Sequence, residues 1–134
     1  MRLGGEEHER TLLAANNYAN SLVKLQRYAE AKSVLRKSIP VARRVLGDSD
    51  KDTLRMRWNC ATALLVDPTA TLGDVREAVT TLEEIEPIAR RVFGDAHLFV
   101  EQVEHFLRES QGLLHKKRKT EATPSPPSRN STLS

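Results

Sequence analysis

The chain has 134 residues, of which 39% are hydrophobic, 29% are charged and only 4% are aromatic. This length suits one domain with a modest core, and the abundance of Ala, Leu, Arg and Glu favours helices over strands. The net charge of +3 is uneven, because residues 116–134 hold five basic residues and one acidic residue, a net +4, which leaves −1 for residues 1–115. The balanced body gives no reason to expect a nucleic-acid-binding surface on the folded part.

The single cysteine, Cys60, excludes an internal disulfide. No apolar run approaches the roughly 18 residues that a membrane-spanning helix needs, and the first residues resemble neither a signal peptide nor a transit peptide. We therefore expect a cytoplasmic protein that makes no contact with membranes.

The first expected element is a helical hairpin. Apolar residues at spacings of three and four cover residues 15–25, and Thr11 is the expected N-cap of this helix. After a turn at residues 26–27, the helical pattern resumes over residues 28–47 and ends on a glycine, the residue type preferred just past a helix end. Upstream, residues 3–4 look like the end of a preceding repeat.

A second hairpin repeats the first. Residues 87–95 match residues 40–48 at seven of nine positions, an offset of 47, whereas residues 53–54 match residues 11–12 at an offset of 42. The second copy has therefore gained five residues, which we place between positions 64 and 75 as a lengthened loop. A basic repeat of about 42 residues is typical of stacked helical hairpins. Pro40 and Pro87 occupy matched positions in the second helices, where each predicts a kink.

A fifth helix is expected over residues 97–115, without a following partner. Such a helix suits the cap of a solenoid, and its outer face would be made polar by Glu101, Glu104, Arg108 and Glu109. Residues 116–134 are basic and then rich in Ser, Thr and Pro, so we expect a disordered tail. The predicted fold is an all-α, α-α superhelix with a domain at residues 1–115, repeats at about 4–47 and 48–94, and this cap.

The repeat resembles the tetratricopeptide repeats of kinesin light chains and related proteins with 42-residue repeats. In the first copy the resemblance is carried by Thr11-Leu12, Asn17, Ala19, Leu22, Tyr28, Glu30-Ala31, Leu35 and Arg43–Gly47. It implies a protein-protein interaction module. From the residues themselves we expect no catalytic site, metal or cofactor. The partner would be a peptide or a helix bound on the concave surface that the first helix of each repeat lines.

The resemblance also implies which residues bind that partner. An Asn amide can both donate to and accept from a peptide backbone, and the indole of Trp58 could anchor an apolar side chain. The predicted peptide-binding residues are Asn16, Asn17, Asn20, Lys24, Arg55, Trp58, Asn59 and Thr62. Two alternatives stay open: Trp58 belongs to the core, and the Asn residues serve as caps or as inter-repeat hydrogen bonds.

Three further hypotheses remain. The chain could be a piece of a larger protein whose repeats are joined to a lost enzymatic domain. It could instead be an oligomerisation element that self-associates through its N-terminal hairpin, where Leu12 and Tyr18 are expected to be exposed. The basic run at the start of the tail is a candidate nuclear import signal, formed by Lys116, Lys117, Arg118 and Lys119. Cys60 is interpreted as a core residue rather than a nucleophile.

Overall fold

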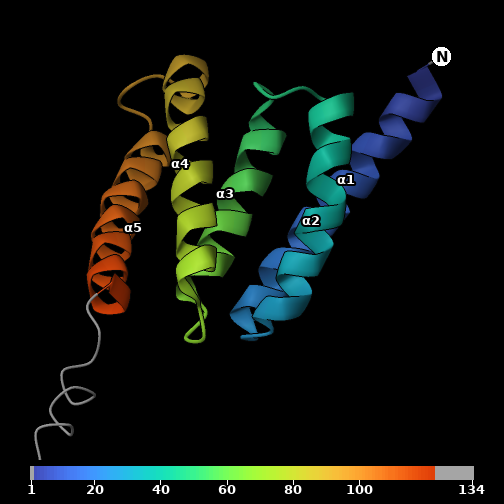
Figure 1. Cartoon of the computed structure of the whole chain (residues 1–134). Coiled ribbons are helices and arrows are strands. Elements are labelled where there is room, and N and C mark those ends of the chain that lie inside the picture. The colour runs from blue at the N-terminus through green and yellow to red at the C-terminus, as the bar shows by residue number, and fades with distance from the viewer. Residues whose placement is uncertain (1, 123–134) are drawn as a thin grey trace, which may run out of the picture.

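The computed structural model describes residues 2–122, which form five helices and no strand. These are α1 (Arg2–Lys24), α2 (Tyr28–Val45), α3 (Lys51–Val66), α4 (Leu72–Phe93) and α5 (Leu98–Ala122). Helices α1 and α2 form one hairpin, α3 and α4 form the next, and α5 packs against α4 at the far end (Figure 1). Helix α3 also contacts both α1 and α5. The expected all-α fold of stacked helical hairpins is confirmed.

Short polar and glycine-containing segments separate the helices. Gln26 adopts a positive φ of 64° in the first turn, and Gly47 and Gly94 follow α2 and α4 with φ of 98° and 100°. The Asp50 carboxylate caps α3 by accepting two backbone N–H groups of its first turn. The lengthened loop lies between α3 and α4, as predicted, and ends at Thr71, whose hydroxyl caps α4 in a capping box.

The matched prolines lie inside their helices. Pro40 is within α2 and Pro87 is within α4, and both are exposed. Each helix continues on both sides of its proline, so neither residue ends its helix. The kink expected at each position stays a prediction.

Two helix boundaries differ from those expected. Helix α1 already begins at Arg2, so Thr11 is an interior residue rather than an N-cap, and residues 3–4 do not end a preceding helix. Elongation of an existing helix fixes one residue per hydrogen bond gained, and no proline interrupts residues 2–10. At the other end, α5 continues past His115 to Ala122 because the Lys and Arg residues there are good helix formers that also suit a helix C-terminus. The rest of the predicted tail, residues 123–134, lies outside the described residues.

Helix α3 buries two stripes of side chains. On α3, one stripe of Leu54, Ala61 and Leu64 is buried, and a neighbouring stripe is buried against α2, where the Thr53 hydroxyl donates to the Ala42 carbonyl at 3.4 Å. Leu54, Ala61 and Leu64 are two turns and one turn apart, and Thr53, Met56, Cys60 and Ala63 of the second stripe are spaced three and four residues apart, which places each set on one side of the helix. Helix α3 is therefore covered on two sides, whereas α1 and α5 are the end helices of the stack.

Ion pairs join neighbouring helices at the edge of this core. Arg57 of α3, itself buried, pairs with Glu84 of α4. Arg90 of α4 pairs with Glu86 on its own helix and with Glu104 of α5, and the hydrogen bonds that it donates to both carboxylates raise the pKa of Arg90. Glu104 was expected on the outer face of the cap, but it faces α4 because this pair holds it there.

Candidate functional site

The predicted Asn residues lie where α1 meets α3. The Asn59 side-chain amide donates to the side-chain carbonyl of Asn16 at 2.6 Å, which joins the first helices of the two repeats. The sequence aligned Asn59 with Asn17 instead, and Asn17 is exposed while Asn20 is half-buried. The inter-repeat hydrogen bond that was left open as an alternative is therefore formed, by Asn16 rather than Asn17.

Trp58 packs between α3 and α5. Its ring lies edge-on to Phe99 and Phe106, with ring centroids 5.8 and 4.7 Å away, and the indole is half-buried. The guanidinium of the neighbouring Arg55 lies 5.3 Å from the ring centroids of Phe93 and Phe99. Both side chains thus stabilise the packing of α5 on the second hairpin.

The remaining predicted residues are more dispersed. The Thr62 hydroxyl donates to the backbone carbonyl of Asn59 at 3.0 Å, one turn earlier on α3. Lys24 is exposed at the last residue of α1. Asn59, Thr62 and Val66 are spaced three and four residues apart, so they lie on one side of α3, which ends at Val66.

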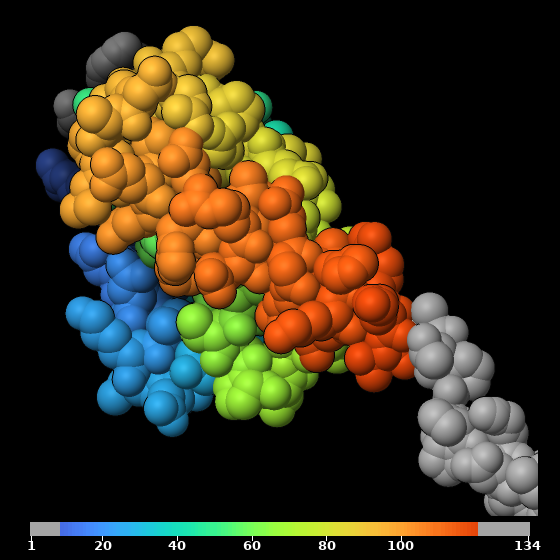
Figure 2. Space-filling model, turned by 90° about the vertical axis from the view of Figure 1, so that its left-hand side faces the viewer, coloured from blue at the N-terminus to red at the C-terminus, as the bar shows by residue number. Residues whose placement is uncertain are grey.

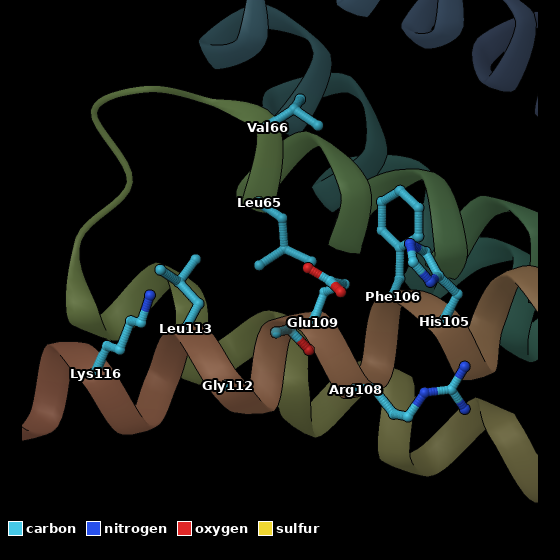
Figure 3. A pocket seen from close by; sticks show the side chains of 10 residues that line it. Leu65, Val66, His105, Phe106, Arg108, Glu109, Gly112, Leu113 and Lys116 are labelled. Atoms are coloured by element: carbon cyan, nitrogen blue, oxygen red, sulfur yellow. The ribbon is translucent and has the colours of Figure 1, made fainter.

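At that end, a cleft of about 530 Å³ opens between α3 and α5 (Figure 3). Leu65 of α3 and Phe106 and Leu113 of α5 supply apolar walls, and the Lys116 side chain lies beside Leu113. Val66, with 44% of its surface exposed, completes the apolar lining. The full lining is Leu65, Val66, His105, Phe106, Arg108, Glu109, Ser110, Gly112, Leu113 and Lys116.

Sequence reasoning missed this cleft. Two signals were present, namely the adjacent apolar pair Leu65-Val66 directly before a polar loop and the isolated Gly112 within an expected helix. Neither signal identifies a cleft without knowledge of how α3 and α5 cross. The cleft lies between two of the odd-numbered helices, α3 and α5.

Gly112 lowers the stability of the protein because it lies inside a helix. It lies within α5, and a Cβ atom added there would meet no atom within 4 Å. Gly112→Ala should therefore raise the free energy of unfolding by about 0.5–1 kcal/mol, because alanine loses less backbone entropy in a helix. Urea denaturation followed by circular dichroism measures this change. An unchanged or lower free energy of unfolding would contradict a helical backbone with open space for a methyl group at position 112.

Other residues singled out in the sequence occupy structural positions. Burial of Cys60 raises the pKa of its thiol, which disfavours the reactive thiolate. Lys116 lines the cleft, Lys117 is half-buried, and Arg118 and Lys119 are exposed, all within α5. No cluster of three His, Cys, Asp or Glu residues suited to a metal ion occurs among residues 2–122, and no helix there has the length and apolarity to cross a membrane.

Comparison with known families identifies one part of this arrangement. Residues 11–52 match the tetratricopeptide repeat family. The matched segment covers most of α1, all of α2 and the first residues of α3. No curated protein and no solved structure matches the chain. Tetratricopeptide repeats generally mediate protein-protein interactions.

Proposed function

We propose that this protein binds a peptide or a helix of a protein partner on the surface formed by α1, α3 and α5. The observation that supports this proposal best is the cleft between α3 and α5, where Leu65, Val66, Phe106 and Leu113 offer an apolar pocket on a folded scaffold. Concave apolar sites with a few polar groups at the edge are typical of binding sites. An apolar side chain of the partner would occupy the pocket.

The polar surroundings of the cleft suit the rest of such a partner. Lys116, Arg108 and Glu109 contribute two positive charges and one negative charge to the lining, and His105 adds a ring nitrogen. Further along the same surface, Asn17 and Thr62 offer polar groups to a bound backbone. We also propose that the repeats are of the kinesin light chain-like kind, which the offset of 42 residues supports.

A peptide-display selection against the full chain tests this function. Peptides selected on the natural sequence should lose at least tenfold in affinity on Val66→Glu, because the carboxylate would occupy the apolar pocket. The matched control is Leu98→Glu, which changes a residue that is 64% exposed and lies outside the cleft, and which should bind as the natural sequence does. Equal binding to both variants, or no saturable binding by any selected peptide, would contradict a site in the cleft.

A further inference from the structure

The outer side of α1 carries an exposed, uncharged stripe at helical spacings of three and four. This α1 stripe consists of Thr11, Ala14, Tyr18 and Ser21 of α1 and of Leu25, the residue directly after the helix, and every member is exposed. Tyr18 and Leu25 are 55% and 65% exposed, unusually open for large apolar side chains. Leu12, expected to be exposed beside Tyr18, is instead buried on the side of α1 that packs in the core.

The same positions are buried in the next repeat. An offset of 42 residues places the first four residues of the α1 stripe on α3, where their equivalents are almost completely covered: Thr53, Met56, Cys60 and Ala63. The fifth equivalent, Asp67, corresponds to Leu25 and follows directly after α3, where it is half-buried and pairs with Lys32 of α2. Helix α2 covers this side, as the hydrogen bond from Thr53 to Ala42 shows. The second helix of the preceding hairpin is thus what covers the stripe on α3.

The pattern recurs on α5. Counting 47 residues on from these five positions gives Val100, Val103, Leu107, Ser110 and Leu114, of which all are buried except the half-buried Leu107. Helix α4 covers this side, where Val75 and Val79 pack with Leu114. The last two residues of the α1 stripe, Ser21 and Leu25, correspond to Ser110 and Leu114. The same two residue types therefore stand at the equivalent covered positions of α5.

The opposite end of the stack is built differently. The core positions Leu54, Ala61 and Leu64 correspond on α5 to Glu101, Arg108 and Gln111, which are all exposed. Figure 2 shows α5 lying across this end of the molecule with its outer side uncovered. The uncovered side of α5 is therefore polar, as suits a cap, whereas the uncovered side of α1 has the composition of a helix contact.

We propose that the α1 stripe binds an amphipathic helix of a partner protein, and that the partner helix lies on α1 as α4 lies on α5. Its contact face would carry Ala and aliphatic residues at helical spacing, because α4 presents Val75, Val79 and Ala89 as buried residues. This surface continues the stacking contact by which α2 covers α3 and α4 covers α5. It lies on a different side of α1 from Asn16, which faces α3.

A second copy of the chain is a poorer occupant. The apolar sides of α2 and α4 are already covered by α3 and α5 within the same chain. Another copy could present only its own α1 stripe or the polar outer side of α5, among the described residues. Neither reproduces the contact that covers α3 and α5, so we assign the stripe to a helix from another protein.

A synthetic peptide of residues 72–93, the α4 sequence, serves as the probe. Added to the full chain, it should bind saturably and shift backbone amide resonances of Tyr18, Ser21 and Leu25 in NMR spectra. The double variant Tyr18→Asp and Leu25→Asp should weaken this binding at least tenfold, because it places two charges in an apolar contact. The control Leu13→Asp changes another exposed leucine of α1 outside the stripe and should leave the affinity within twofold.

Two results would overturn this assignment. The first is that the peptide shows no saturable binding, or that the double variant leaves its binding unchanged. In the latter case, resonance shifts centred on α5 would mean that the peptide replaces α4 in its contact with α5. The second is a dimer of the natural chain in sedimentation velocity that the double variant abolishes, which would make a second copy the occupant. All three substituted residues are exposed, so we expect the variants to fold. Circular dichroism of each variant checks that its helices are intact.

Discussion

Ala61→Arg should lower the free energy of unfolding by about 4 kcal/mol or more, whereas Arg108→Ala should change it by less than about 0.5 kcal/mol. These are matched positions, because Arg108 of α5 corresponds to Ala61 of α3 at the repeat offset of 47. Ala61 has no exposed surface, so an arginine there would be overpacked and its charge buried without a partner. Arg108 is exposed at the uncovered side of α5, where its removal costs little.

Urea denaturation monitored by circular dichroism compares the two variants directly. Ala61→Ser is the control for a small polar group, and its free energy of unfolding should lie between those of Ala61→Arg and Arg108→Ala. If Ala61→Arg were as stable as the natural chain, α4 would not cover α3 as the structure has it. If Arg108→Ala were strongly destabilised, the outer side of α5 would not be the solvent-exposed cap.

Much of the fold could be predicted because local sequence features mark the repeat. The glycines at positions 47 and 94, the matched segments that precede them and the turn at residues 26–27 mark hairpins without any tertiary information. Helix ends were less predictable. Thr11 has the chemistry of an N-cap, yet the elongation of α1 through residues 2–10 made that cap unnecessary.

The candidate site depended more on tertiary geometry. Asn16 and Asn17 are neighbours in sequence, and only the crossing of α1 and α3 decides that Asn16 meets Asn59. Likewise, Leu65 and Leu113 come together because α5 follows α4 at a particular angle, which no local pattern specifies. Residue type predicted which groups were suited to binding, but the arrangement of helices decided which of them are free.

The contrast between the two ends of the stack has a thermodynamic consequence. In a solenoid each hairpin gains stability from its neighbours, so an end helix is held from one side only. The outer side of α5 presents Glu101, Arg108 and Gln111 to solvent, whereas Tyr18 and Leu25 expose apolar surface at the α1 stripe. A bound helix on α1 would therefore stabilise the N-terminal hairpin by mass action.

Trp58→Ala should lower the free energy of unfolding by about 3 kcal/mol, because the indole fills the contact between α3 and α5. The substitution removes the edge-on contacts of the indole with Phe99 and Phe106. The contacts of Arg55 with Phe93 and Phe99 remain. Trp58→Phe retains an aromatic ring at this position and should cost about half as much. Urea denaturation followed by circular dichroism measures both changes.

Hydrogen exchange separates packing from a binding role for this tryptophan. Because α5 is an end helix held partly through Trp58, its amides should lose protection first in Trp58→Ala, while those of α2 should change little. Tyr18→Ala, which removes an exposed aromatic residue, should leave the exchange of α5 unaltered. A Trp58→Ala protein with unchanged stability and unchanged protection of α5 would mean that the indole contributes little to packing and is free to serve a partner.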